Sequence, residues 1–421
     1  MKVGIIGSGG REHALCYAIK KSKKVEKIFC IPGNAGTQEI AENIDLDINN
    51  FELLKGFIKE NNIDIIIIGP EKPLVEGIVD FLETNKIKVF GPNKLASKLE
   101  GSKIFTKNLC KKYNIPTAKF GIFKNKNETN KILEKASHPL VIKADNLASG
   151  KGVYICKNIE DSIIAVNEIF GGKFGLAKNI LVEEFLEGEE MSYFIISDGK
   201  NINQFGTAQD HKRVGEGDKG KNTGGMGAYS PSRLINKELE NKILNKIIIP
   251  TLKGLSDLGT NYIGFLYAGL MIKDNEPYLI EYNVRMGDPE CQTILPLLDS
   301  DLLDILLACV NVKLIDTSIK WKKLQSLCVV LCSKGYPDEY EKNIKISNFN
   351  EIDLDENNYL FHAGTKKENN EILSIGGRVL NFISLSNNLI SARKNVLENL
   401  YKLNWDKGFF RKDIAFKVID K

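Results

Sequence analysis

The stretch Glu281-Tyr-Asn-Val-Arg-Met-Gly-Asp-Pro-Glu-Cys-Gln292 decides how this chain is interpreted. It follows an apolar run at residues 278–280, and this pattern predicts the last strand of an antiparallel sheet. Side chains alternate along a strand, so Glu281, Asn283 and Arg285 are expected on one face. Two oxygen ligands and a guanidinium suit Mg2+ and a phosphoryl or carboxylate group. A solvated strand face carrying charges of both signs is the alternative interpretation.

A tight turn, Gly287-Asp288-Pro289-Glu290, adds two carboxylates beside the same face. The pattern Glu281-x-Asn283-x-Arg285 resembles the metal-binding strand of ATP-grasp ligases. Residues 285–292 are similar to the signature of the glycinamide ribonucleotide synthetase (phosphoribosylamine-glycine ligase) family. The resemblance implies that Glu281 and Asn283 bind Mg2+ or Mn2+, with ATP oxygens and water as the remaining ligands. It also implies that Arg285 steadies the phosphoryl and glycyl oxygens during transfer.

The bulk composition is that of a soluble globular protein. A chain of 421 residues is too long for one ordinary core, so about two to four domains are expected. The formal net charge is only +4 and no basic run is present, which argues against nucleic acid as a partner. The apolar runs are too short to span a membrane and no signal peptide precedes the first strand, so a cytoplasmic protein is expected. The eight cysteines lack a Cys-x-x-Cys pair and are expected to be reduced and buried, and no obligate protein partner is evident.

Short apolar runs separated by helix-length segments predict a Rossmann-like parallel sheet in residues 1–101. The first strand leads into Gly7-Ser-Gly-Gly-Arg-Glu-His13, where the start of a helix can receive an anion on free backbone N–H groups. Glu12 stands where a dinucleotide fingerprint requires glycine, so NAD is disfavoured. A phosphate monoester beside Arg11 fits better, with Glu12 on a sugar hydroxyl or amine. A glycine turn needed only for packing is the alternative.

The family resemblance extends through this N-terminal domain and implies that it lines the phosphoribosylamine side of the cleft. The residues expected there are Gly9, Gly10, Arg11, Glu12 and Glu71.

Residues 102–295 resemble an ATP-grasp domain, with a mobile subdomain at about 118–190. Lys143 ends an apolar strand, where a lysine without a partner would be costly, so a phosphate is a natural partner. The small-residue loop 146–152 is suited to folding over a triphosphate with backbone donors, although its spacing alone is a weak signal. Residues 180–190 read as a strand and an acidic turn, for which an edge strand with solvated acids is the alternative. The resemblance implies an ATP site formed by Lys103, Lys143, Ser149, Gly150, Lys151, Gly152, Glu183, Glu184, Phe185, Leu186 and Glu190.

Residues 209–231 form a long segment without hydrophobic periodicity, and such a segment inside a compact domain is usually functional or disordered. Its dense charges suit a sugar phosphate, although His211 alone would more often be a surface histidine. The resemblance assigns His211, Lys212 and Arg213 to phosphoribosylamine. Either Asp210 or Asp288 is expected to take the proton of the attacking amine, and neither ranks above the other.

The remaining chain is expected to form a linker helix at 296–326 and a small α+β domain at 327–421 that caps the cleft. The predicted fold is therefore a multidomain α/β and α+β protein with a Rossmann-like, an ATP-grasp and a C-terminal domain.

The resemblance implies ATP-dependent ligation of glycine to 5-phosphoribosylamine through a glycyl phosphate, giving glycinamide ribonucleotide, ADP and phosphate in de novo purine (IMP) biosynthesis. A carboxylate does not accept an amine at neutral pH, so its conversion to an acyl phosphate explains the need for ATP. Two alternatives are another ATP-grasp carboxylate-amine ligase or carboxylase of purine metabolism, and a nucleotide-binding module without ligase activity.

Overall fold

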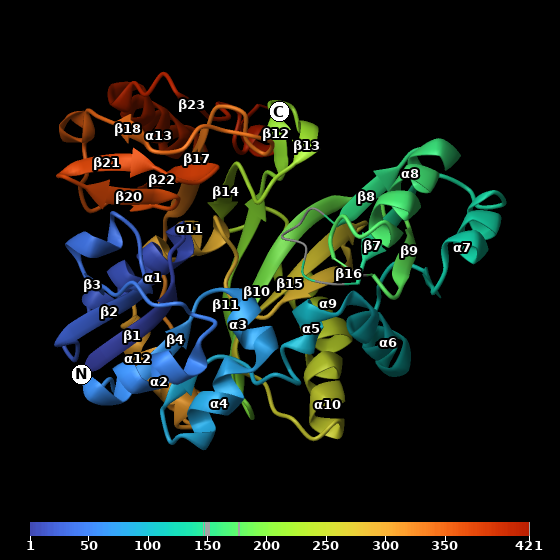
Figure 1. Ribbon diagram of the computed structural model, residues 1–421, viewed down its shortest axis with the longest axis horizontal. Coiled ribbons are helices and arrows are strands. Elements are labelled where there is room, and N and C mark those ends of the chain that lie inside the picture. Colours follow the sequence, from blue (N-terminus) through green and yellow to red (C-terminus); the bar gives the residue numbers. More distant parts are fainter. Residues whose placement is uncertain (146, 148–151, 176, 421) are drawn as a thin grey trace.

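The computed structural model describes residues 1–145, 147, 152–175 and 177–420. Its N-terminal part is a five-stranded parallel sheet in the order β3-β2-β1-β4-β5 (Figure 1). The strands are β1 (Lys2–Gly7), β2 (Lys27–Pro32), β3 (Glu42–Asn43), β4 (Ile65–Ile68) and β5 (Val89–Phe90). The helices are α1 (Gly10–Lys20), η1 (Thr37–Glu39), α2 (Phe51–Glu60), α3 (Glu71–Glu76), α4 (Ile78–Thr84) and α5 (Lys98–Gly101). The predicted Rossmann-like sheet is confirmed.

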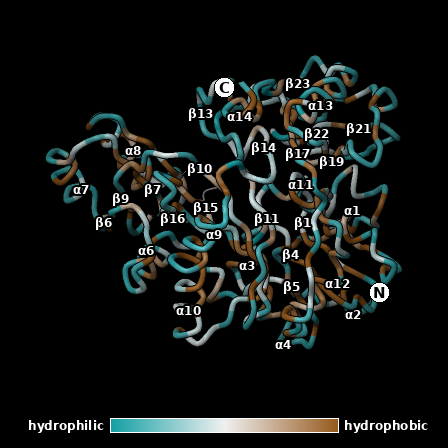
Figure 2. Tube along the Cα trace, turned by 180° about the vertical axis from the view of Figure 1, so that it is seen from behind, coloured by the Kyte–Doolittle hydropathy of each residue, from teal (hydrophilic) through white to brown (hydrophobic). Residues whose placement is uncertain are grey.

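Strand β4 shows why this sheet is buried on both faces. Its four isoleucines are all buried. Ile65 and Ile67 pack in the same core as helices α1 and α12 (Leu302–Val310), whereas Ile66 and Ile68 pack with α2 and α4. An uninterrupted apolar run is therefore required, because helices cover both sides. Figure 2 shows hydrophobic segments along these inner strands and the facing helices.

A separate lobe stands to the right of the main body in Figure 1. Its antiparallel sheet has the order β6-β9-β7-β8. Its elements are β6 (Phe120–Phe123), α7 (Lys126–Leu133), β7 (Leu140–Ala144), β8 (Val153–Cys156), α8 (Ile159–Phe170) and β9 (Ile180–Glu184), preceded by α6 (Lys103–Tyr113). The lobe has its own hydrophobic core, which includes Leu133, Ile142 and Ala165. Its motion relative to the body stays a prediction.

The main body contains a nine-stranded sheet in the order β16-β15-β10-β11-β14-β17-β22-β19, with β23 pairing to β17. Strand β14 of the central domain pairs with β17 of the C-terminal region. The small C-terminal module therefore extends the sheet of the central domain. The strands are β10 (Glu189–Asp198), β11 (Ile202–Asp210), β14 (Gly227–Ser230), β15 (Ile263–Lys273), β16 (Glu276–Asn283), β17 (Gln325–Ser333), β19 (Asn358–His362), β22 (Arg378–Ser386) and β23 (Gly408–Phe409).

Smaller elements complete the body. Two short sheets pair β12 (Arg213–Gly215) with β13 (Lys219–Asn222), and join β18 (Ile344–Ile346), β21 (Glu371–Ser374) and β20 (Thr365–Glu368). The remaining helices are α9 (Lys237–Ile243), η2 (Leu244–Ile248), α10 (Ile249–Asp257), α11 (Glu290–Ile294), η3 (Leu295–Leu297), η4 (Leu314–Asp316), η5 (Phe349–Glu351), α13 (Leu389–Leu403) and α14 (Phe416–Ile419). All eight cysteines are free and buried. None of the helices in the described part of the chain has the length and apolar character that crossing a membrane would require.

Candidate active site

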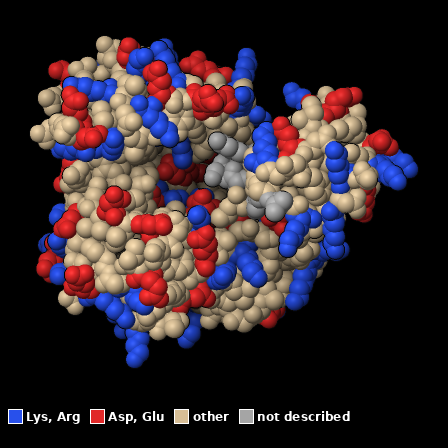
Figure 3. All heavy atoms as spheres, viewed as in Figure 1, with Lys and Arg blue, Asp and Glu red and all other residues tan. Residues whose placement is uncertain are grey.

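A cavity of about 1000 Å3 lies where the N-terminal domain, the lobe, the central sheet and the C-terminal region meet. Figure 3 shows the hollow between body and lobe, with charged side chains of both signs along its edges. The predicted site residues that line the cavity are Gly9, Arg11, Glu12, Glu71, Lys103, Lys143, Gly152, Glu183, Glu184, Phe185, Leu186, Glu190, Asp210, His211, Lys212, Arg213, Glu281, Asn283, Arg285 and Asp288. Ser149, Gly150 and Lys151 lie outside the described residues. Gly10 does not line the cavity wall formed by the described residues.

Strand β16 brings Glu281 and Asn283 to the cavity by means of a bulge. Its partner β15 pairs Leu270 with Leu279 and Gly269 with Glu281, so Ile280 is an extra residue. In a regular strand, the side chain of Glu281 would lie on the same face as that of buried Leu279. The bulge at Ile280 places Glu281 on the other face, and the side chains of Glu281 and Asn283 both line the cavity. The strand ends at Asn283, so Arg285 reaches the cavity from the following turn and not from the strand face that the sequence predicted.

The two acceptors of β16 fit a hard cation only when a nucleotide is present. Glu281 supplies a carboxylate and Asn283 an amide oxygen on the same wall. Within the described ranges, no group of three or more His, Cys, Asp or Glu side chains is placed to hold a metal ion. Two side-chain oxygens are too few for the octahedron of Mg2+, so phosphate oxygens and water would have to supply the other ligands.

Two lysines reach the cavity on the side of the lobe. Lys103 is the first residue of α6, whose N-terminal cap Ser102 and the N–H of Ile104 both donate to Asp145 at 3.0 Å. Burial lowers the pKa of Lys103. Lys143 of β7 places Nζ 3.0 Å from the buried carboxylate of Glu183. The side chain of Glu183 therefore contacts a lysine, and its expected role toward adenine rests on its backbone.

Residues 185–188 connect β9 of the lobe to β10 of the body and have no regular structure. Phe185 is exposed there. Glu190, at the start of β10, accepts a 2.8 Å hydrogen bond from Nζ of Lys212, and this lysine lowers the pKa of Glu190. The connection thus carries the residues expected to meet the adenosine part of ATP.

Asp210 and Asp288, the two candidates for proton transfer, lie in different environments. Asp210 ends β11 with Nζ of Lys212 4.0 Å away, and burial raises the pKa of Asp210 to about 7. Asp288 instead accepts from Gln292 Nε2 at 2.8 Å, and Arg378 Nη1 lies 3.1 Å from its carboxylate. Burial opposes ionisation of Asp288, but the neighbouring arginines outweigh it and lower its pKa. A carboxylate whose pKa lies near neutrality and that has no close arginine partner in the described part of the chain suits proton transfer, so its surroundings favour Asp210 over Asp288.

His211 lines the cavity, but both of its ring nitrogens already face protein partners. Nε2 accepts a 2.9 Å hydrogen bond from the N–H of Ala415, and Nδ1 lies 3.4 Å from Asp218. Burial lowers the pKa of His211. Because Nε2 accepts a hydrogen bond, it carries no proton, so the ring is neutral and joins the 209–231 segment to the C-terminal region. Arg213 donates to the carbonyl oxygen of Gly220 at 2.9 Å.

Carboxylate oxygens already accept hydrogen bonds from backbone N–H groups at the start of α1. Glu12 accepts from Gly9 N at 2.6 Å and from Arg11 Nε at 2.6 Å. A Cβ atom at Gly69 would lie 2.1 Å from Oε1 of Glu12, so this glycine makes room for the carboxylate. Asp288 Oδ2 lies 3.4 Å from Arg11 N. The expectation of free N–H groups for an anion at this turn is therefore corrected for Gly9 and Arg11.

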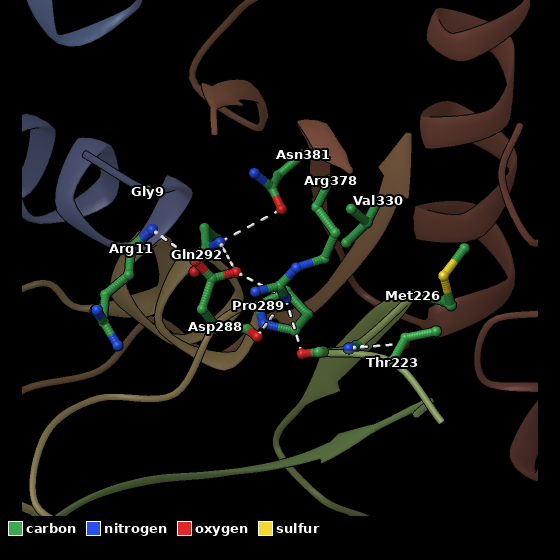
Figure 4. A network of polar contacts seen from close by, with 12 residues as sticks. Gly9, Arg11, Thr223, Met226, Asp288, Pro289, Gln292, Val330, Arg378 and Asn381 are labelled. Carbon is green, nitrogen blue, oxygen red and sulfur yellow. Dashed lines mark hydrogen bonds and ion pairs between the residues drawn. The ribbon is translucent and has the colours of Figure 1, made fainter. Parts of the chain in front are cut away.

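Figure 4 shows a network around Asp288 that joins three parts of the chain. Arg378 of β22 donates through Nη1 to the carbonyl oxygens of Asp288 at 2.6 Å and Gly224 at 2.8 Å. Gln292 donates to Asn381 at 3.3 Å. Gly10 lies beneath these amides, since a Cβ there would lie 2.4 Å from Asn381 Nδ2. Gly10 therefore allows close packing at this point, and its expected contact with phosphoribosylamine stays a prediction.

The charged residues of the cavity wall to which sequence reasoning gave no role include Glu100 and Arg378. Arg285 donates to Glu100 at 2.6 Å and to Glu71 at 3.2 Å, so two carboxylates of the N-terminal domain hold its guanidinium. Arg285 lowers the pKa of Glu71 to about 2. The sequence offered only weak signals for these two residues. Glu100 lies two residues before Ser102 and reads as an ordinary helix-start acid, and Arg378 stands between two glycines and the apolar run of a C-terminal strand.

Replacing Glu100 with glutamine is expected to change how stability depends on pH. Burial raises the pKa of Glu100 from 4.5 to about 7, so the folded chain holds this proton to higher pH than the unfolded chain. The contribution of Glu100 to the free energy of unfolding therefore falls as pH rises from about 5 to 7. The wild-type value minus the Glu100→Gln value should decrease by up to about 1 kcal/mol per pH unit. Urea unfolding of both proteins from pH 5 to 8 measures this difference, and a constant difference would contradict the assignment.

All three domains of the chain match known proteins. Family models described as the N, ATP-grasp (A) and C domains of phosphoribosylglycinamide synthetase match residues 1–100, 101–291 and 326–417. The chain is 43% identical to phosphoribosylamine–glycine ligase of Brucella melitensis, covering 100% of this chain and 99% of that protein. It is 44% identical to the chloroplastic enzyme of Arabidopsis thaliana, covering 97% and 79%.

Solved structures agree. The crystal structure of phosphoribosylamine–glycine ligase from Thermotoga maritima superposes with a TM-score of 0.86 at 34% identity, covering 99% of this chain and 100% of that one. A biotin carboxylase from Campylobacter jejuni shares the fold alone, with a TM-score of 0.73 at 15% identity, covering 100% of this chain and 95% of that one. The three matched domains and the full-length relatives place this chain in the phosphoribosylglycinamide synthetase (phosphoribosylamine–glycine ligase) family.

Proposed function

We propose that this chain ligates glycine to 5-phosphoribosylamine at the expense of ATP, giving glycinamide ribonucleotide, ADP and phosphate in the de novo purine pathway of the cytoplasm. The observation that carries the proposal is that lysines of the lobe and body, the acceptors of β16 and the buried carboxylate of Asp210 line the same cavity. The relatives named for this reaction span the full length of the chain and support the choice of substrates.

The first step joins a carboxylate oxygen of glycine to the γ-phosphorus of ATP, and the bond to the ADP oxygen breaks. Lys103 and Lys143 supply positive charge around the phosphates, because phosphoryl transfer depends mainly on positioning and charge neutralisation. Lys212, which was expected on phosphoribosylamine, contributes here as well, because it donates to Glu190 on the nucleotide side. Glu281 and Asn283 would hold Mg2+ or Mn2+, which neutralises phosphate charge when bound.

The second step forms the amide bond. The amine of phosphoribosylamine attacks the glycyl carbonyl carbon, phosphate leaves with the electron pair of the C–O bond, and Asp210 accepts a proton from nitrogen. The carboxylates of Glu12 and Glu71 also line the cavity and are suited to hydroxyl and amine groups. Arg285 lines the cavity and is held by the carboxylates of Glu71 and Glu100 and by the carbonyl oxygen of Met286.

The test is ADP release with Mg2+-ATP, glycine and freshly generated phosphoribosylamine, omitting each component in turn and determining the product mass. Release that needs all three, with a product of glycinamide ribonucleotide mass, is the expected result. ADP release without phosphoribosylamine, or with another carboxylate in place of glycine, would contradict the substrate assignment.

Replacing Glu281 with glutamine is expected to raise the Mg2+ concentration needed for half-maximal activity and to lower turnover. The change removes the one charged ligand of the pair and keeps the size of the side chain. A Mg2+ titration at saturating ATP measures the effect, and Asn283→Ala should act in the same direction. If both variants show the Mg2+ dependence of the wild type, the assignment of Glu281 and Asn283 as metal ligands is wrong.

A further inference from the structure

Lys107 is a buried lysine with no assigned role. It lies on α6 one turn after Lys103, and its side chain is only 3% exposed. It is absent from the part of the cavity wall that the structure describes, whereas Lys103 lines it. Burying an ammonium group is costly unless partners compensate for the lost water, so the contacts of Lys107 need an explanation.

The partners of Lys107 connect it to the nucleotide side of the cavity. Its Nζ lies 3.1 Å from Oε2 of Glu183 and donates to Oγ1 of Thr117 at 2.6 Å. The same carboxylate lies 3.0 Å from Nζ of Lys143. The side chains of the three charged residues are 3–5% exposed. One carboxylate is therefore shared by two buried ammonium groups, and the cluster carries an excess positive charge beside the cavity.

Lys107 also contacts both chain segments by which the lobe joins the body. Thr117 lies just before β6, the first strand of the lobe, and Glu183 lies near the end of β9, its last strand. Thr117 in turn donates to the carbonyl oxygen of Leu279 at 2.6 Å, and Leu279 N donates to Pro116 at 2.8 Å. Figure 1 shows α6 at the base of the lobe. The contacts of Lys107 thus tie the lobe to β16 two residues before Glu281.

We propose that Lys107 is a positioning residue for the triphosphate, and the proposal rests on the ATP site of the proposed function. By sharing Glu183, Lys107 prevents this carboxylate from cancelling the charge of Lys143. Without Lys107, Glu183 would pair with Lys143 alone, and the excess charge would fall from +1 to zero. Electrostatic effects are strong at a buried site, so the loss acts directly on phosphate binding.

The first measurement is the affinity of the folded full chain for a non-hydrolysable ATP analogue with Mg2+, by calorimetry. Lys107→Met is expected to weaken this binding by about tenfold or more, while adenosine, which lacks phosphates, should bind as it does to the wild type. Lys111→Met, an exposed lysine of the same helix, is the matched control and should bind both ligands normally. Equal loss of adenosine and analogue binding in Lys107→Met would indicate a merely structural role and overturn the proposal.

The double variant Lys107→Met/Glu183→Gln makes the decisive comparison. Removing both charges leaves Lys143 without a competing carboxylate, so affinity for the analogue should return to within about threefold of wild type, a strongly non-additive result. In the single variant Lys107→Met, the buried carboxylate of Glu183 has lost one of its two lysine partners. The double variant removes this carboxylate, so it tests the proposal even if the single variant fails to fold. A double variant that binds the analogue about tenfold or more weakly than the wild type overturns the proposal. Because binding needs neither glycine nor phosphoribosylamine, failure here is distinguishable from failure of the ligase assignment.

Discussion

Replacing Asp210 with asparagine is expected to lower kcat/KM for phosphoribosylamine ~10²–10⁴-fold, the range for loss of a general base. Asparagine keeps the shape of the side chain at the end of β11 but accepts no proton from the attacking amine. Affinity for an ATP analogue should be preserved or increased, because Lys212, with Nζ 4.0 Å from this carboxylate, loses a competing negative charge. Steady-state kinetics with varied phosphoribosylamine and analogue calorimetry separate the two effects.

The pH dependence of kcat/KM provides a second test of Asp210. Burial raises the pKa of Asp210 to about 7, and only the deprotonated form accepts a proton. The wild-type kcat/KM should therefore fall as pH decreases below about 7, and this acid limb should be absent in Asp210→Asn.

Asp288→Asn is the matched control for Asp210→Asn. Asp288 is paired with Arg378 and accepts from Gln292, so it is not free to act as a base. Its replacement should leave the acid limb in place and reduce kcat/KM less. Wild-type kinetics with an unchanged acid limb in Asp210→Asn would contradict the assignment.

The sequence predicted local elements well where burial imposes a pattern. The isoleucines of β4 and the alternation before Glu281 both identified strands, because period and composition report burial directly. Yet Glu281 reaches the cavity only because Ile280 forms a bulge, which simple alternation does not predict. The expected strand face holds for Glu281 and Asn283 and ends before Arg285.

Features that depend on contacts distant in sequence were not predictable. The start of α1 looked like an empty anion site, but Asp288, 277 residues further along the chain, lies against Arg11 N. The C-terminal domain looked separate because nothing in a short apolar strand reveals that β17 pairs with β14. Glu100 and Arg378 were missed for the same reason, since their significance comes from the partners that the fold brings to them.

Replacing Arg378 with methionine is expected to destabilise the protein by roughly 2–3 kcal/mol, below the range for a fully buried ion pair because both side chains keep some solvent contact. The guanidinium opposes the charge of Asp288 and bonds the carbonyl oxygens of Asp288 and Gly224 (Figure 4). Methionine fills much of the volume but leaves Asp288 without its cation. Urea unfolding at about pH 7.5 measures the loss, because the lowered pKa of Asp288 keeps its carboxylate ionised there.

Two variants show whether this loss comes from the stranded carboxylate. Adding Asp288→Asn to Arg378→Met should recover a large part of the stability, because the unpaired charge is then removed. Arg393→Met breaks a more exposed pair with Asp420 and should cost about 1 kcal/mol or less. Equal losses of unfolding free energy in Arg378→Met and Arg393→Met, with no recovery in the double variant, would mean that the charge of Arg378 does not stabilise the fold. Recovery would mean that charge holds β22 to the turn at residues 287–290, and through Arg378 the C-terminal region also contributes to the cavity wall.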